Sequence, residues 1–114
     1  MKLQSKSFKN NKEIPAKYGC AGDGVSPHLN WSDFPQQTKS FALVCRDPDA
    51  PSGDFVHWMI ANIPADVNEV AEGAMLIKQA DNITNDFGKS EYGGPCPPSG
   101  IHRYFFIIYA LNKE

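Results

Sequence analysis

Residues 40–63 read SFALVCRDPDAPSGDFVHWMIANI, two apolar runs separated by a segment of Pro, Asp and Gly. The first run, Ser40–Val44, and the second, Phe55–Ile63, are short and rich in aromatic and β-branched residues. Runs of this kind, bounded by Pro, Gly or Asp, are typical of β-strands. The stretch therefore predicts two strands joined by the loop Asp47–Gly53.

A third apolar run, Arg103–Leu111 (RYFFIIYAL), has the same composition. Its nearly continuous apolar character is typical of a central strand that is covered on both faces. The 114 residues allow one domain with one core. No repeat, low-complexity tract or linker divides the chain, so we predict a single β-rich domain over residues 1–114.

Charge and composition narrow the possible partners. The formal net charge of −2, without any run of Lys or Arg, gives no electrostatic reason to expect nucleic acid. Residues 1–19 contain no apolar stretch, so we expect neither a secretory signal nor an integral membrane segment. Three cysteines, Cys20, Cys45 and Cys96, cannot all pair within one chain, which predicts a reduced, cytoplasmic setting.

Two carboxylates, Asp47 and Asp49, lie in a segment that Pro48 and Pro51 stiffen. One interpretation is a pre-organised binding site, because the prolines lower the entropic cost of ordering the loop. The other is a rigid turn whose Asp side chains accept hydrogen bonds from nearby backbone N–H groups. The spacing by itself favours the turn.

One histidine lies within a predicted strand and another lies directly before one. Alternation along a strand should point His57 and Trp58 to opposite faces. A histidine in an apolar strand is more often a hydrogen-bonded structural residue than a ligand. By the same alternation His102 and Tyr104 share a face and Arg103 takes the other, where we expect it to be structural and to pair with a carboxylate behind the site.

Cys96, within Pro95–Pro97, is the candidate nucleophile, with His102 near it in sequence. Thiolate catalysis needs a base and an orienting group, and no orienting group is evident. We therefore expect the chain to have no enzymatic activity. The alternative function is a hydrolase that uses Cys96 or His57/His102. A metal could be bound by the two carboxylates and two histidines, but no close-spaced ligand pair supports it, so we expect no cofactor.

Taken together, four segments resemble the phosphatidylethanolamine-binding protein family, also called the Raf kinase inhibitor-like family. They are KYGCAGDGVSPHLNW (Lys17–Trp31), KSFALVCRDPDAP (Lys39–Pro51), HWMIANIP (His57–Pro64) and YGGPCPPSGIHRYFFIIYAL (Tyr92–Leu111). The Asp-Pro-Asp-x-Pro and Gly-Pro-x-Pro-Pro…His-Arg-Tyr motifs, in this order, are specific. The compact loops and the Cys-Pro-Pro segment are similar to the short prokaryotic branch, and the resemblance covers nearly all of the chain.

This resemblance implies a mainly β fold, in which a large antiparallel sheet packs with a smaller sheet and helices are few and short. It implies a small anion-binding pocket at one end of the large sheet, with the ligand-binding residues Asp47, Asp49, His57, Gly94, Pro95, His102 and Tyr104. Family pockets accept phosphate-like groups, including phosphoethanolamine, and some members bind kinases or other proteins. The expected partners are thus a small phosphate-like or phosphoethanolamine ligand and a protein such as a kinase. A cis peptide at Ala50–Pro51 is also implied.

An anion beside Asp47 and Asp49 poses an electrostatic problem. Either the carboxylates hold protonated histidines in place, or a proton is shared with the ligand, or the carboxylates recognise an amine. The first two routes add a proton to the complex. We therefore expect affinity for phosphate or phosphoethanolamine to rise as pH falls from about 8 to 6.

The family normally continues past the Tyr-Ala-Leu strand with a helical segment and a closing strand. This chain ends at Leu111–Glu114, so the resemblance is to the larger, N-terminal part of the family fold. We expect apolar surface to remain beside the last strand, and the chain to form a homodimer, aggregate or be only marginally stable.

Overall fold

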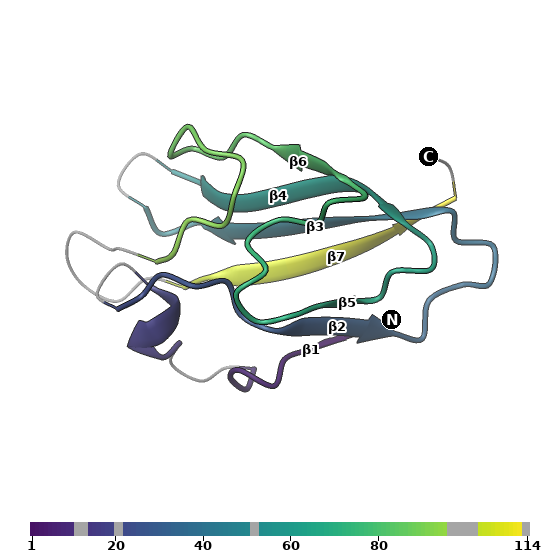
Figure 1. Cartoon of the computed structure of the whole chain (residues 1–114), viewed down its shortest axis with the longest axis horizontal. Helices are drawn as coiled ribbons and strands as arrows, with labels where there is room; N and C mark the ends of the chain where they lie inside the picture. Colours follow the sequence, from purple (N-terminus) through teal and green to yellow (C-terminus); the bar gives the residue numbers. More distant parts are fainter. Residues whose placement is uncertain (11–13, 20–21, 51–52, 96–102, 113–114) are drawn as a thin grey trace.

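The computed structural model describes residues 1–10, 14–19, 22–50, 53–95 and 103–112. Over these ranges the chain is almost entirely β, and its helical content is one 3₁₀ turn, Ala16–Tyr18 (Figure 1). The three predicted strands are confirmed as β3 (Ser40–Asp47), β4 (Phe55–Pro64) and β7 (Phe105–Leu111). No helix in the described ranges is long and apolar enough to cross a bilayer.

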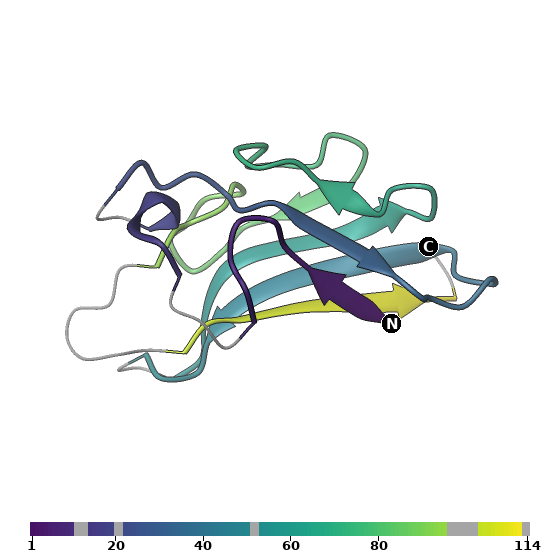
Figure 2. The ribbon, with the colours of Figure 1, turned by 90° about the horizontal axis from the view of Figure 1, so that it is seen from below.

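The strands form two antiparallel sheets. The large sheet has the order β6-β4-β3-β7, where β6 is Asp81–Ile83. The small sheet has the order β1-β2-β5, made of β1 (Lys2–Gln4), β2 (Leu29–Ser32) and β5 (Glu69–Val70). The small sheet lies over one face of the large sheet (Figure 2). The predicted fold, a large antiparallel sheet packed with a smaller one, is confirmed.

The core lies between the two sheets and is built from large apolar side chains of both. Trp31 of β2, Phe41 and Leu43 of β3 and Trp58 of β4 are all fully buried in it. The rings of Trp31 and Phe41 meet edge to face, with centroids 5.6 Å apart. Burying one such side chain stabilises the fold by roughly 1.5–3 kcal/mol, so this contact between sheets fixes their relative position.

A β-bulge in β4 overturns the expectation that His57 and Trp58 point to opposite faces. The register moves from Arg46↔Val56 to Cys45↔Trp58, which leaves His57 as an extra residue on β4. Both side chains are buried and both contact the segment 85–93, His57 through Gly93 and Trp58 through a ring of that segment. Strict alternation fails here because the inserted residue shifts the phase of the strand.

β7 also differs from its prediction as a central strand covered on both faces. Among the described residues it pairs with β3 alone, at the edge of the large sheet. Phe106 and Ile108 pack against the core, whereas Phe105, Tyr109 and Leu111 are exposed. The apolar pattern of a strand predicts which side chains it is able to bury. Which strands lie beside it depends on the tertiary structure.

Candidate functional site

Three of the predicted site residues meet at one end of the large sheet. Asp47 is the last residue of β3, and it pairs with Phe55 at the start of β4. Tyr104 directly precedes β7, whose first residue pairs with β3 one position before Asp47. His57 and Tyr104 stand with ring centroids 5.4 Å apart and nearly perpendicular planes. Segments far apart in sequence thus place Asp47, His57 and Tyr104 together.

The His57 ring is oriented by the backbone of Gly93. Nδ1 lies 2.8 Å from the Gly93 carbonyl oxygen, and a carbonyl oxygen only accepts, so Nδ1 carries the hydrogen. In the neutral ring Nε2 is therefore the unprotonated nitrogen and an acceptor. Among the described residues the side-chain hydrogen bond of this ring is the one to Gly93, and the Gly94 backbone adds a further, smaller interaction with the ring. The bond to Gly93 thus orients the ring and leaves its second nitrogen with acceptor capacity.

Aromatic rings enclose His57 and change its protonation. Phe55, Phe87 and Tyr104 surround the imidazole at centroid distances of 5.1, 5.2 and 5.4 Å. Burial lowers the pKa of His57, against smaller opposing effects of the Gly93 carbonyl and the Asp47 charge. His57 is consequently neutral at pH 7 in the protein without a ligand.

Tyr104 is affected in the opposite sense. Burial, followed by the charge of Asp47 and the nearby thiol of Cys45, raises the pKa of Tyr104 to about 12. Its hydroxyl therefore keeps its proton across the physiological range. A protonated hydroxyl is able to donate a hydrogen bond to an acceptor such as a phosphate oxygen.

Asp49 is engaged by Arg103, the residue expected to pair with a carboxylate. The guanidinium donates from Nε to Oδ2 and from Nη2 to Oδ1, each at 2.9 Å, and the Arg103 backbone N–H donates to Oδ2 at 2.8 Å. The expected pairing of Arg103 with a carboxylate is confirmed, but the partner is Asp49, a predicted ligand-binding residue, and not a carboxylate behind the site. Asp47 Oδ1 accepts the Asp49 backbone N–H at 2.8 Å, as the turn interpretation of this segment requires. The Arg103 pair holds the turn against the start of β7.

Gly94 and Pro95 lie against the 3₁₀ turn. A Cβ added at Gly94 would lie 2.6 Å from the Tyr18 carbonyl oxygen, and one added at Gly19 would lie 2.8 Å from the Pro95 carbonyl oxygen. Glycine at both positions allows the two backbones to approach this closely. The Tyr92 hydroxyl donates to the same Tyr18 carbonyl at 2.8 Å. The described role of Gly94 is therefore to let the segment that orients His57 pack closely.

Sequence reasoning missed the scaffold that carries Phe87. Asn85 is buried, and its Oδ1 accepts the backbone N–H groups of Phe87 and Lys89. Its Nδ2 donates to the carbonyl oxygens of His57 and Glu91. The signal available in the sequence was Asn85 ahead of Asp-Phe-Gly, which is typical of a side-chain-stabilised turn.

Other predictions fall outside the described residues, namely those for His102, for Cys96 and for the Ala50–Pro51 peptide bond. Cys45 is described, and it is fully buried beneath the site. Burial raises the pKa of its thiol, so it carries no thiolate at neutral pH. Within the described ranges no three His, Cys, Asp or Glu residues group as metal ligands.

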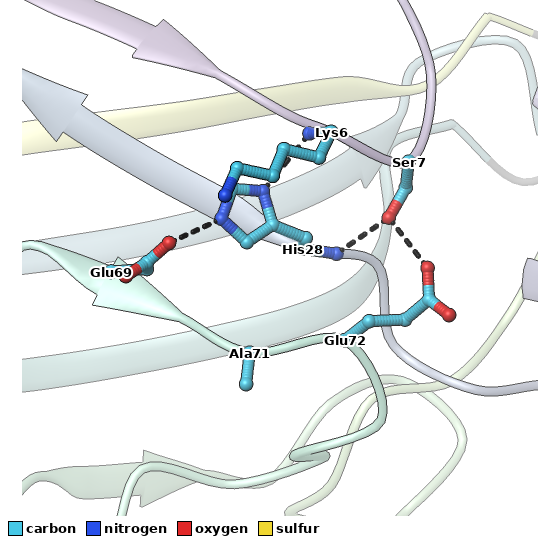
Figure 3. A pocket seen from close by; sticks show the side chains of 6 residues that line it. All are labelled: Lys6, Ser7, His28, Glu69, Ala71 and Glu72. Atoms are coloured by element: carbon cyan, nitrogen blue, oxygen red, sulfur yellow. Dashed lines mark hydrogen bonds and ion pairs between the residues drawn. The ribbon is translucent and has the colours of Figure 1, made fainter.

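A polar hollow of about 540 Å³, lined by residues that include His28, Glu69 and Glu72, lies away from this site (Figure 3). His28 Nδ1 accepts the Lys6 backbone N–H at 2.9 Å, so Nε2 carries the hydrogen and donates to Glu69 at 2.6 Å. Glu72 accepts bonds from Ser7, Lys17 and the Tyr18 hydroxyl. Both nitrogens of His28 are engaged within the protein. The hydrogen bonds that line this hollow therefore hold the N-terminal segment against β2 and β5.

The fold and the sequence match one family. The family model described as phosphatidylethanolamine-binding protein matches residues 4–114. The UPF0098 protein of Aquifex aeolicus is 48% identical over 119 residues, which cover all of this chain and 70% of that protein. The chain belongs to the phosphatidylethanolamine-binding protein family. Within it, the chain falls in the short prokaryotic branch, with the UPF0098 proteins.

Two solved structures have the same fold. A phosphatidylethanolamine-binding protein homolog from Chlamydia trachomatis superposes with a TM-score of 0.90 at 40% identity, covering 97% of this chain and 74% of that one. Escherichia coli YbcL, described as a member of the mammalian family, gives a TM-score of 0.90 at 36% identity, with 97% and 76% covered. The predicted resemblance is confirmed for both sequence and fold.

Proposed function

We propose that this chain binds a small phosphate-like anion, with phosphoethanolamine as the expected class of ligand, beside Asp47, His57 and Tyr104. The observation that supports this most is the state of His57. Its ring is nearly buried, oriented through Nδ1 by the Gly93 carbonyl, and walled by aromatic side chains, while Nε2 keeps its acceptor capacity. Membership in the family supports this proposal, because the family's ligand pocket is expected at this end of the large sheet.

A shared proton allows an anion to approach Asp47. A phosphate dianion and a carboxylate repel at close range, and burial strengthens the repulsion. A phosphate monoanion still carries a hydrogen, which it can donate to Asp47 or to Nε2 of neutral His57. The Tyr104 hydroxyl then donates to a phosphate oxygen. Binding by this route selects the protonated form of the ligand.

The role proposed is binding without turnover. The buried Cys45 supplies no thiolate, and the described residues give His57 no nucleophile to activate. Assays with generic ester and phosphoester substrates should show no turnover. Turnover that His57→Gln abolishes would contradict this role. We further propose that the chain works in the cytoplasm and binds a protein partner such as a kinase.

Calorimetric titration with phosphoethanolamine, and separately with inorganic phosphate, tests the site. His57→Gln should weaken binding at least tenfold, because it removes the oriented imidazole. His28→Gln is the matched control, since His28 is similarly buried but engaged at both nitrogens, and it should bind as the wild type does. Equal losses in the two variants, or no binding at millimolar ligand, would contradict the site.

The same titration at several pH values tests the shared proton. For one proton taken up, phosphoethanolamine affinity should rise about tenfold per pH unit as pH falls from about 8 toward the second phosphate pKa, about 6. Asp47→Asn should flatten this dependence and leave the fold intact. Affinity that stays constant from pH 8 to 6 would contradict the shared proton while leaving the site in place.

A further inference from the structure

The ring of Phe87 lies against both partners of the hydrogen bond that orients His57. Its centroid is 5.2 Å from that of the imidazole, and the two planes meet at 71°. A Cβ added at Gly93 would lie 2.3 Å from Phe87 Cδ2 and 2.4 Å from Cε2, so the ring fills the space that a side chain at Gly93 would need. The donating imidazole and the residue whose carbonyl accepts thus share one aromatic neighbour.

Hydrogen bonds beside Phe87 hold its ring in this place. Buried Asn85 accepts the Phe87 backbone N–H at 2.9 Å. Asp86 makes two bonds to Val56, the residue before His57. Its Oδ2 accepts the Val56 N–H at 2.7 Å, and its own N–H donates to the Val56 carbonyl at 3.0 Å. The segment that carries Phe87 is therefore fixed to β4 next to His57.

The surroundings of the Nδ1–Gly93 bond decide how firmly the tautomer of His57 is held. A hydrogen bond that water does not reach is stronger than one in contact with solvent, and water beside the Gly93 carbonyl would compete with Nδ1. Without the bond, the hydrogen of the neutral imidazole is free to reside on either nitrogen. Nε2 is an acceptor only while Nδ1 carries that hydrogen.

We propose that Phe87 is a positioning residue for His57, whose ring keeps water from the Nδ1–Gly93 bond and so holds Nε2 in its acceptor form. The inference rests on the proposed function, in which a phosphate monoanion donates its hydrogen to Asp47 or to Nε2. Phe55 supports the Phe87 ring from the side, with the two centroids 4.8 Å apart.

Three titratable groups from different parts of the chain face His57. They are Asp47 at the end of β3, Asp86 in the segment that carries Phe87, and Tyr104 before β7. Burial lowers the pKa of His57, and the charges of Asp47 and Asp86 oppose it by smaller amounts. Removing the Phe87 ring reduces the burial and leaves both carboxylates, so the pKa of His57 should rise toward 6.5.

Nitrogen NMR of the ligand-free chain from about pH 5 to 8 tests the proposal, because it shows which ring nitrogen of His57 carries the hydrogen. In the wild type this should be Nδ1. Phe87→Ala should move part of the hydrogen to Nε2 and raise the pKa, whereas Phe87→Leu, which keeps apolar bulk, should stay close to the wild type.

A second variant leaves Phe87 itself unchanged. Gly93→Ala should act as Phe87→Ala does, because the added methyl group displaces the ring, while the bond from the residue 93 N–H to the His57 carbonyl, 3.0 Å in the wild type, stays available. Phe34→Ala is the matched control, since Phe34 packs on Phe41 at the other end of β3. It should leave the His57 spectrum unchanged.

Calorimetric titration with phosphoethanolamine at pH 7.5 adds a binding measurement. Phe87→Ala should weaken binding about fivefold, the effect of weakening one hydrogen bond, and Phe87→Leu less than about twofold. Failure of the wild type to bind would contradict the proposed function, whereas the positioning role is decided by the spectra of the ligand-free chain.

Three results would overturn the positioning role. The first is a hydrogen that stays on Nδ1 in both Phe87→Ala and Gly93→Ala. The second is an equal change in Phe34→Ala, which would indicate general loosening of the fold. The third is a Phe87→Leu variant as impaired as Phe87→Ala, because exclusion of water needs apolar bulk and not an aromatic ring.

Discussion

His57 and His28 lie in two parts of the molecule, are 4% and 8% exposed, and differ in how their rings are bonded. His28 accepts the Lys6 backbone N–H at Nδ1 and donates to Glu69 from Nε2. His57 donates from Nδ1 to the Gly93 carbonyl and is otherwise surrounded by aromatic rings. Burial alone therefore does not separate a structural histidine from a candidate binding histidine.

The two histidines differ in the hydrogen-bonding capacity that remains on the ring. A histidine with both nitrogens engaged joins two segments, and a ligand could reach it only by breaking one of those bonds. A histidine held by one nitrogen is oriented, and its second nitrogen keeps its acceptor capacity. The residues around His28 therefore form a structural hydrogen-bond network, whereas the aromatic rings around His57 enclose a candidate binding site.

The largest expected effect comes from the glycine that lets the His57 region pack. Gly94→Ala would place a Cβ 2.6 Å from the Tyr18 carbonyl oxygen and 2.9 Å from the Gly19 Cα, both backbone atoms that cannot move alone. We expect the free energy of unfolding to fall by about 3 kcal/mol. Urea unfolding measures it.

Gly73→Ala is the control from the His28 region. Gly73 has φ of +81° and open space around a Cβ, so the substitution costs only backbone strain, about 1 kcal/mol. If the two variants lost equal stability, the close contact between Gly94 and the 3₁₀ turn would not be what holds the His57 region.

The next effect distinguishes the two histidines by stability. His28→Leu leaves the part-buried Lys6 N–H without its acceptor and removes the bond to Glu69, so the loss of two hydrogen bonds should cost about 1–3 kcal/mol. His57→Leu removes one bond to a carbonyl oxygen and should cost about 1 kcal/mol. Urea unfolding at pH 7.5 measures both. A greater loss for His57→Leu would reverse the assignment of structural and candidate binding roles.

The smallest effects appear in the pH dependence of stability. The pKa of His57 is lowered from 6.5 in the folded chain, so the unfolded chain binds more protons and stability falls as pH drops below about 6.5. Hydrogen bonds from Lys17, Tyr18 and Ser7 lower the pKa of Glu72 from 4.5 to about 2. Its contribution, present above about pH 4.5, is lost as pH falls toward 2.

Thermal melts of His57→Gln and Glu72→Gln at pH 2–8 separate these two windows. His57→Gln should flatten the profile below pH 6.5 and leave the acid end unchanged. Glu72→Gln should flatten it only below pH 4.5, and by less, because exposed carboxylates are screened by solvent. Profiles identical to the wild type in both variants would show that neither group links protonation to folding.

Several features were predictable because they depend on local chemistry. The runs Ser40–Val44, Phe55–Ile63 and Arg103–Leu111 predict strands by their aromatic and β-branched composition, and the structure confirms all three. The pairing of Arg103 with a carboxylate was predictable as well, since a charged residue beside an apolar strand needs a partner. The motifs carried the family resemblance, and through it the two-sheet fold.

What the sequence by itself determined is thus which segments become strands, which family the chain resembles, and which side chains are candidates for the site. Tertiary structure alone decided that a bulge buries His57 beside Trp58, that β7 pairs with β3 alone among the described residues, and that His28 is engaged at both nitrogens. The physical reason is the sequence distance over which each interaction acts. Strand propensity acts between neighbouring residues, whereas the phase of a bulge, the cover of a strand and the second bond of a ring depend on segments tens of residues away.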